Sequence, residues 1–417
     1  MNKNLTTYFV ELIKTKRKEK ELSLENISVL VSIDKGYLSK IENRIVYPSP
    51  EILASILNEF GIKLIFEESI LNQMSEKLDK LYFDIVYLNQ IDHEYINKTI
   101  FSQEDLYSSS FIFDKYLVIK YVYLVTTKKK RELISSVEEI IEAKLIKFNI
   151  MNSDLLQVYY DYKGTALKNE SKLEEALEVY EKCKSLGYYK YSYGMVCYHM
   201  AIVYISLNNN LAAYTNVKES LMIFVQEYNL KRQQYSQIHL ANIYSVSKQY
   251  IKADSIYRSL MIGNAEKEFK YLVHINLIWN LIKQDKYLLA IDELMIVEEK
   301  YTVQLKWYYF LSWCYYKTNQ FNYSLEIIES IDSTNLNDSI DWSKIKVIKL
   351  LITESDKREM IKMIKDEYQI KQMIMNNEDK KFFLEILVEE YSKILCYKEV
   401  NKYQDSLLKL LSWLNYH

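Results

Sequence analysis

"LSLENISVLVSIDKGYLSKIENRIVYPSPEIL", residues 22–53, predicts the fold of the first part of this 417-residue chain. Its apolar residues recur at helical spacing, and Ser23 and Asp34 each stand where a short helix would need an N-cap. Pro48 and Pro50, the only prolines of the chain, break it before a further helix. The two short helices expected at residues 24–31 and 35–43, joined by a turn of a few residues, predict a helix-turn-helix. In that motif the later helix, here residues 35–43, enters the major groove of DNA.

Four short helices are expected to share one small core in this region. They are predicted at residues 5–18, 24–31, 35–43 and 51–60. The second helix is expected to turn Ile27, Leu30 and Val31 inward, and the third helix Leu38 and Ile41. Because this register fixes the inner face of the third helix, it also fixes which side chains point outward.

This stretch resembles the Cro/C1-type (XRE) helix-turn-helix family over about the first 66 residues. The matching residues are Leu22, Ser23, Glu25, Ile27, Ile33, Leu38, Ser39, Ile41, Glu42, Asn43, Pro48, Ser49, Ile52 and Leu53. The sequence departs from the family pattern at Leu24 in place of glutamine, Ser28 in place of alanine, Ser32 in place of the turn glycine and Arg44 in place of the terminal glycine. The resemblance implies a sequence-specific DNA-binding domain.

Carried over position by position, the resemblance implies a DNA-binding surface on the third helix. Its residues would be Ser23, Lys35, Gly36, Tyr37, Ser39 and Lys40. A lysine can donate to guanine O6 or N7, and Gly36 would let the helix come close to the DNA. The alternative is that Lys35 and Lys40 only solvate an exposed helix; we favour DNA contact, because the apolar register turns both lysines outward.

Charge balance predicts that the protein acts as a pair. A basic run, Lys14, Lys16, Arg17, Lys18 and Lys20, is expected to contact the DNA backbone. Residues 1–68 nevertheless hold ten basic and ten acidic side chains. One copy should therefore bind DNA weakly, so a homodimer on a double-stranded operator is expected.

The composition predicts a long helical body in the cytoplasm. The chain has six glycines and no proline after Pro50, so turns built on these residues cannot be common. No apolar run approaches the ~18 residues of a membrane span, and the basic cluster of the first 20 residues follows the apolar ones, the reverse of a secretory signal. The fold class is therefore predicted as all-α.

No catalytic or metal-binding pattern is found in the sequence. The four cysteines, Cys183, Cys197, Cys314 and Cys396, are too scattered for metal-ligand spacing and are expected to be reduced. Three histidines, His199, His239 and His274, lie on different predicted helices without a paired nucleophile, carboxylate or ligand. The protein is therefore predicted not to be an enzyme and to need no cofactor.

Five internal repeats follow residue 150. Each repeat has a small anchor residue in its second helix, and the anchors are spaced by 37, 40, 37 and 34 residues: Ala176, Ala213, Ala253, Ala290 and Ser324. Twelve residues before each anchor lie Gly164, Ala201, Ala241, Ile278 and Ser312, and nine before lie Leu167, Tyr204, Tyr244, Leu281 and Tyr315. Such recurrence predicts paired helices that approach closely at the small residues.

The repeats resemble the tetratricopeptide repeat (TPR), most clearly in "GTALKNESKLEEALEVY", residues 164–180. This resemblance implies that a TPR-like right-handed helical solenoid follows the helix-turn-helix domain. Four segments are expected: the DNA-binding domain at 1–68, a linker helix and divergent entry helices at 69–150, TPR-like repeats at 151–335, and divergent helices with a cap at 336–417.

A TPR solenoid lines its concave face with the first helix of each repeat, and this face suits an extended peptide. By register, the peptide-binding residues would be Asp161, Thr165, Tyr198, Tyr235, Asn242, Trp279, Tyr309, Trp313 and Tyr316. For any single aromatic residue, packing between helices is the alternative. Asn242 is the strongest candidate, because an amide between Ala241 and Ile243 can donate to and accept from a peptide backbone.

An XRE domain on a TPR body resembles in layout the peptide-pheromone receptors of the RRNPP group (Rgg, NprR, PlcR and PrgX). This resemblance implies a cytoplasmic homodimeric transcription regulator that binds a short signalling peptide in its TPR groove, as in quorum sensing. Two alternatives remain open: a body that docks a protein partner such as a response regulator, and a phage- or plasmid-type repressor that binds no peptide.

Overall fold

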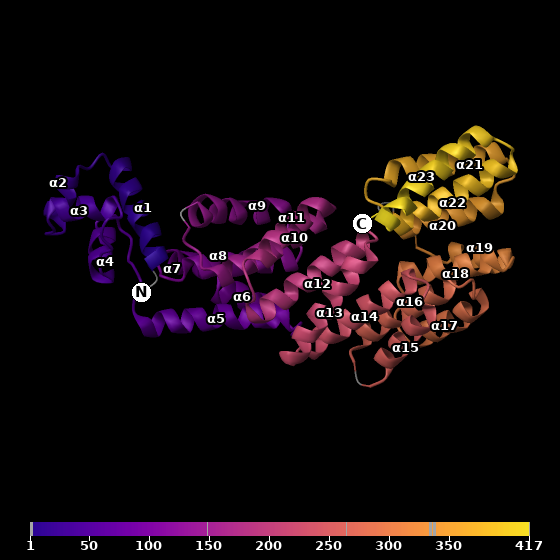
Figure 1. The fold of residues 1–417 in the computed structure, drawn as a ribbon, viewed down its shortest axis with the longest axis horizontal. Helices are drawn as coiled ribbons and strands as arrows, with labels where there is room; N and C mark the ends of the chain where they lie inside the picture. Colours follow the sequence, from indigo (N-terminus) through magenta and orange to yellow (C-terminus); the bar gives the residue numbers. More distant parts are fainter. Residues whose placement is uncertain (1–2, 148, 264, 333–335, 337–338, 417) are drawn as a thin grey trace. The chain divides into compact units, whose positions relative to one another are not determined.

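The computed structural model describes residues 3–147, 149–263, 265–332, 336 and 339–416, and these residues confirm the all-α prediction (Figure 1). Within these ranges the only β pairing is an isolated bridge between Ile65 and Ser110. The chain divides into two compact units, the first made of Met1–Val196 with Glu227–Arg232 and the second of Cys197–Gln226 with Gln233–His417. The boundary between the units falls inside the segment in which repeats are predicted.

Four helices form the amino-terminal head, which we define as residues 3–66. They are α1 (Lys3–Glu19), α2 (Leu24–Leu30), α3 (Lys35–Glu42) and α4 (Pro50–Asn58). Ser23, Asp34 and Ser49 cap α2, α3 and α4, each accepting a hydrogen bond from a backbone N–H in the first turn. The core of the head is fully buried at Phe9, Ile13, Ile27, Leu38, Ile41, Leu53, Ile56 and Leu57. The predicted helices and the two N-caps, Ser23 and Asp34, are confirmed.

The prediction that Leu30 points inward is wrong. Its side chain is 55% exposed, and Ser28 is buried instead. The reason is the turn that follows: Ser32 has a left-handed φ of 54°, and the amide of Ile33 bonds back to the Ser28 carbonyl at 3.0 Å. Arg44 also has a left-handed φ, 58°, so both departures from the family's glycines stand where the backbone favours glycine.

The rest of the first unit packs around a helix that is buried on nearly every side, α8 (Phe113–Thr126). Its neighbours are α5 (Glu68–Val86), α6 (His93–Thr99), the 3₁₀ turn η1 (Phe101–Gln103), α7 (Glu104–Ser108), α9 (Arg131–Ile140), the π-helix η2 (Ile141–Ile146) and α10 (Ser153–Asn169). Helix α11 (Leu173–Ser185) packs on α10. The head packs against this part of the first unit through aromatic rings. The ring centroids of Tyr8 and Phe113 lie 5.4 Å apart, and those of Phe9 and Phe111 lie 5.2 Å apart.

The segment Glu227–Arg232 closes the carboxyl end of α5. Arg232 is buried and donates to the Val86 carbonyl at 2.8 Å and to the Ile85 carbonyl at 3.2 Å. Asn229 donates a further hydrogen bond to the Val86 carbonyl at 3.2 Å. Carbonyls at a helix end lack partners within the helix, and a cation there also favours the helix dipole, so this segment stabilises the last turn of α5.

The second unit continues the helix pairs. Helix α12 (Lys190–Ser206) leads into it, followed by α13 (Asn210–Gln226), α14 (Leu230–Val246), α15 (Tyr250–Met261), α16 (Lys267–Ile282), α17 (Tyr287–Lys300), α18 (Leu305–Lys317), α19 (Phe321–Glu329), α20 (Ile340–Thr353), α21 (Lys357–Lys371), α22 (Asn377–Lys393) and α23 (Tyr397–Tyr416). No helix in the described part of the chain is both long and apolar enough to span a membrane.

Small residues hold each helix pair of the repeats together, as predicted. All five anchors are completely buried: Ala176, Ala213, Ala253, Ala290 and Ser324. The close approach is clearest in the first pair, where a Cβ added to Gly164 would lie 2.5 Å from the ring of Tyr180. In the fifth pair the Ser324 hydroxyl donates to the carbonyl of Ser312 at 2.9 Å.

The turns between paired helices repeat as well, although no glycine forms them. Five residues before each anchor, the chain takes a left-handed φ at Ser171, Asn208, Lys248, Asp285 and Asn319. The amide of the residue that follows then donates a hydrogen bond to the carbonyl of the residue nine positions before the anchor, at 2.8 to 3.1 Å. In the first pair, for example, the Lys172 amide donates to the Leu167 carbonyl at 3.0 Å. This is the hydrogen-bond pattern of a Schellman helix end. The body therefore forms these turns from ordinary residues, at a conformational cost of roughly 1–2 kcal/mol each.

Candidate DNA and peptide sites

The outer face of α3 carries the predicted DNA-binding side chains. Lys40 is exposed, and Tyr37 is half-buried. Lys35 lies in the first turn with its side chain 58% exposed, and its ammonium pairs with the Glu25 carboxylate of α2. An acidic side chain thus pairs with one of the two lysines. A phosphate or a base edge would have to compete with Glu25 for Lys35, whereas Lys40 is open to solvent.

The remaining predicted contacts have local structural roles. The Ser23 hydroxyl caps α2 by accepting from the Asn26 amide at 3.0 Å. A Cβ added to Gly36 would lie 3.0 Å from the Asp34 carboxylate that caps α3, so a side chain there would crowd the cap. Ser39 is half-buried and accepts from the Asn43 side chain at 3.4 Å. Ser23 and Gly36 therefore act at the amino ends of α2 and α3, and Ser39 contacts the C-cap residue of α3.

A buried ion pair between α1 and α3 positions α3, and no local sequence pattern predicts it. Arg17 donates to both carboxylate oxygens of Glu42, at 2.6 and 2.8 Å, and to the Leu22 carbonyl at 2.8 Å. The hydrogen bond with Glu42 raises the pKa of Arg17. The expectation that Arg17 contacts a DNA phosphate is therefore wrong, since its side chain is only 15% exposed and is committed to Glu42.

We expect the Lys40→Ala variant to bind the operator less tightly by about 1–3 kcal/mol, because it removes an exposed donor from the recognition helix. The measurement is a gel-shift series at one fixed salt concentration with the full-length protein. Lys63→Ala is the matched control, since Lys63 is an exposed lysine of the head outside α3. Equal losses for Lys40→Ala and Lys63→Ala would show that α3 is not the reading surface.

Seven of the predicted peptide-binding residues lie in the second unit, on the first helices of successive pairs. Tyr198 on α12 is nearly buried, and its hydroxyl lies 3.2 Å from Nε2 of His239 on α14. Tyr235 is half-buried and meets the ring of Phe269. Asn242 is half-buried on α14, and its amide oxygen accepts a hydrogen bond from the hydroxyl of Tyr257. The buried Tyr257 hydroxyl thereby orients the Asn242 amide.

The other aromatic residues of this set meet α22. Trp279 stacks on Phe310 with a ring separation of 5.2 Å, and its indole N–H donates to Glu378 at 2.9 Å. Tyr309 is buried, and both Tyr309 and Trp313 pack against Phe382 of α22. The ring of Tyr316 stacks on that of Trp313. Three of the residues predicted to line the groove, Trp279, Tyr309 and Trp313, thus contact α22 of the same chain, which the repeat pattern could not show.

Two predicted peptide-binding residues, Asp161 and Thr165, belong to the first unit. Asp161 is completely buried. Thr165 is buried too, and its hydroxyl bonds to the Asp161 carbonyl at 3.1 Å and lies 3.0 Å from the hydroxyl of Tyr180. Both residues therefore lie inside the pair formed by α10 and α11. A role for them in peptide binding stays a prediction.

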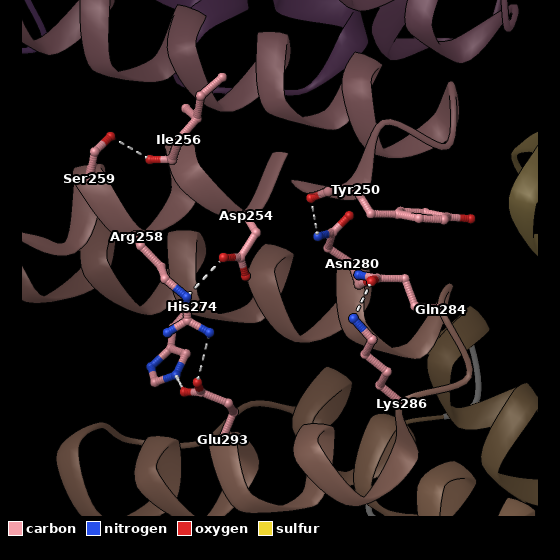
Figure 2. Close-up of polar contacts among 10 residues, drawn as sticks. All are labelled: Tyr250, Asp254, Ile256, Arg258, Ser259, His274, Asn280, Gln284, Lys286 and Glu293. Carbon is pink, nitrogen blue, oxygen red and sulfur yellow. Dashed lines mark hydrogen bonds and ion pairs between the residues drawn. The ribbon is translucent and has the colours of Figure 1, made fainter. Parts of the chain in front are cut away.

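The statement that His274 lacks a carboxylate partner is wrong. Nε2 of His274 on α16 lies 2.7 Å from Glu293 on α17, and Arg258 on α15 bonds both Asp254 and Glu293 (Figure 2). The hydrogen bond from His274 lowers the pKa of Glu293. The partners stand on successive helices 19 residues apart, so no local spacing signals them. Among the described residues, no three His, Cys, Asp or Glu side chains could hold a metal ion.

The head and the paired helices define a class: a helix-turn-helix protein with a TPR-like body. The Helix-turn-helix family model HTH_3 matches residues 13–66. "Transcriptional activator NprA" of Geobacillus stearothermophilus is 27% identical over 212 residues, 48% of this chain and 49% of that protein. The chain thus matches about half the length of this curated relative.

Two solved structures share the fold. A "Rap Protein Complexed with Competence and Sporulation Factor" matches 82% of this chain and 99% of its own, with a TM-score of 0.66 and 15% identity. The "apo form of the quorum sensor NprR from B. thuringiensis" also matches 82% and 99%, with a TM-score of 0.63 and 16% identity. With the XRE-type head, these matches confirm the resemblance to the RRNPP regulators.

Proposed function

We propose that the protein is a cytoplasmic transcription regulator whose head binds DNA and whose TPR-like body responds to a short signalling peptide. The observation that carries the proposal is the joining of the two parts in one chain. An XRE-type head presents exposed Lys40 on its recognition helix. The body places Tyr198, Asn242 and Trp279 on the first helices of successive pairs, the helices that line the concave face of a TPR solenoid.

The relatives support both halves of the proposal. NprA is described as a transcriptional activator, and NprR as a quorum sensor. The Rap structure contains Competence and Sporulation Factor. We carry over from these names a DNA partner and a bound signalling factor. That this factor is a short peptide follows from the resemblance to the RRNPP receptors, and the balanced charge of the head leads us to add a homodimer on the operator.

We expect the Asn242→Ala variant to bind the signalling peptide about ten- to a hundredfold more weakly, because a hydrogen bond to the peptide backbone worth about 1–3 kcal/mol is lost. The measurement is calorimetry of the full-length protein with synthetic peptides taken from short reading frames beside the gene. Asn276→Ala is the matched control: Asn276 lies on α16, but its amide donates to the Leu272 carbonyl of its own helix at 2.7 Å.

The proposed function is tested by operator binding with and without that peptide. We expect the peptide to change operator affinity in the parent and in Asn276→Ala, and to do so in Asn242→Ala only at higher concentration. A peptide that binds without changing operator affinity would contradict the control of DNA binding. If no peptide binds the parent, a body that docks a protein partner would be the better explanation.

A further inference from the structure

The first turn of α22 contacts two of the first helices of the second unit, α12 and α16. The Asn377 side chain donates to the carbonyl of Ser206, at the end of α12, at 3.2 Å. One carboxylate oxygen of Glu378 accepts from the indole N–H of Trp279 at 2.9 Å, and the other accepts from the ammonium of Lys283 at 2.6 Å. A single helix turn thus contacts α12 and α16, although 171 residues separate Ser206 from Asn377.

The turn itself is held without Glu378. Asn376 and Asp379 form the capping box of α22, in which each side chain accepts from the other residue's backbone N–H. Asp379 also pairs with the buried ammonium of Lys344, which lies over the ring of Tyr309 at 4.7 Å from its centroid. Glu378 therefore makes no capping hydrogen bond in α22. In the described part of the chain, the hydrogen bonds of its carboxylate go to Trp279 of α16 and to Lys283, the C-cap of that helix.

The two donors on α16 are fixed in place by their own neighbours. The indole of Trp279 lies nearly parallel to the ring of Phe310, which sets the direction of its N–H. Lys283 follows one helix turn later, and its ammonium lies 5.3 Å from the centre of the Trp279 ring. An N–H and an ammonium converging on one point are suited to a carboxylate, since charge-assisted hydrogen bonds are the stronger ones.

Glu378 is held as an anion but remains open to exchange. Although burial raises the pKa of Glu378, the charge and hydrogen bond of Lys283 and the indole hydrogen bond of Trp279 outweigh it and lower the pKa. The side chain of Glu378 is nevertheless 45% exposed. The Lys283 side chain, by contrast, is only 18% exposed, so a second carboxylate from solvent would reach its ammonium by taking the place of Glu378.

We propose that Trp279 and Lys283 form a carboxylate subsite of the peptide groove, and that Glu378 occupies this subsite until a peptide with an acidic group displaces it. The inference rests on the proposed function and adds the chemistry of the ligand: an acidic side chain or a free carboxyl terminus. An internal group at high effective concentration weakens the apparent affinity of its competitor, so losing Glu378 strengthens binding of acidic peptides.

The test uses two libraries of short fluorescent peptides that differ only in a fixed glutamate or glutamine. We expect Glu378→Gln to bind the glutamate library roughly tenfold more tightly than the parent does, a factor typical of the coupling between two sites in one protein. The two proteins should bind the glutamine library with equal affinity. Adding Lys283→Met should abolish the gain. Glu385→Gln is the matched control, because it removes the same charge from an exposed position of α22, where Glu385 pairs with Lys381.

Hydrogen exchange without peptide gives a second readout. We expect the first turn of α22 and the Trp279–Lys283 segment to exchange faster in Glu378→Gln than in the parent or in Glu385→Gln. Unchanged exchange rates in Glu378→Gln would overturn the proposal. Faster exchange without any preference for the glutamate library would also overturn it, because Glu378 would then only stabilise the contact between α22 and α16. A preference for acid with no effect of any peptide on operator binding would keep the subsite and overturn the proposed function.

Discussion

Glu42→Gln is expected to lower the free energy of unfolding of the helix-turn-helix head by about 3–5 kcal/mol, because breaking a buried ion pair leaves the other charge without compensation. Glu42 is 5% exposed and accepts both hydrogen bonds of the buried ion pair with Arg17. The measurement is hydrogen exchange of α1 to α4 in the full-length protein. Amides that exchange only when the head unfolds should exchange roughly a hundred- to several-thousandfold faster in Glu42→Gln than in the parent.

The head contains its own control for this prediction. Arg44 and Glu11 also pair between the end of α3 and α1, but their side chains are 36% and 26% exposed. Glu11→Gln should therefore cost at most about 1 kcal/mol, as exposed ion pairs do. Equal effects of Glu42→Gln and Glu11→Gln would contradict the role of the buried ion pair. A double replacement of Arg17 and Glu42 by leucine should recover part of the loss, since no charge is then left unpaired.

Asp114→Asn is expected to stabilise the first unit at neutral pH by about 3 kcal/mol. Asp114 lies in the first turn of α8 and is 5% exposed. Burial raises the pKa of Asp114 to about 6 from the ordinary 3.8, and the amide of Lys115, which donates to it at 2.8 Å, only partly offsets this effect. The neutral asparagine keeps an acceptor for that amide without burying a charge.

The sign of the pH dependence follows from the raised pKa. Above about pH 6 the folded protein must hold a buried anion, whereas below the ordinary pKa of 3.8 the group is neutral in both states. The contribution of Asp114 to stability should therefore increase as pH falls from 7 towards 4, and Asp114→Asn should flatten this dependence. Thermal unfolding across that range tests it, with the exposed Asp105→Asn as control. A parallel pH profile in parent and Asp114→Asn would contradict the prediction.

Much of the fold could be predicted from local patterns. The helices of the head, the caps Ser23 and Asp34, and the burial of the five repeat anchors are confirmed. These features depend on neighbours within about one helix turn, or on a spacing that recurs along the chain. Leu30 shows the limit, because the direction of the chain after α2 is set by the left-handed Ser32, which no apolar pattern encodes.

The site was only partly predictable, because its charged partners are distant in sequence. Register placed Lys35, Lys40 and Asn242 on particular helix faces. It could not show that Glu25 pairs with Lys35, that Tyr257 orients Asn242, or that Arg17 is committed to Glu42. Each of these pairs joins different helices, and a long side chain chooses its partner only after the helices have packed.

The all-α class, the helix-turn-helix head and the period of the repeats follow from local sequence, since helix spacing, caps and small anchor residues act over short distances. Which segment contacts the first helices of the second unit depends instead on how the helices pack. Glu378 meets Trp279 across 99 residues, and Asn377 meets Ser206 across 171. Such contacts depend on the small rotation of each helix pair relative to the next, which accumulates along a solenoid and is not fixed by any single repeat.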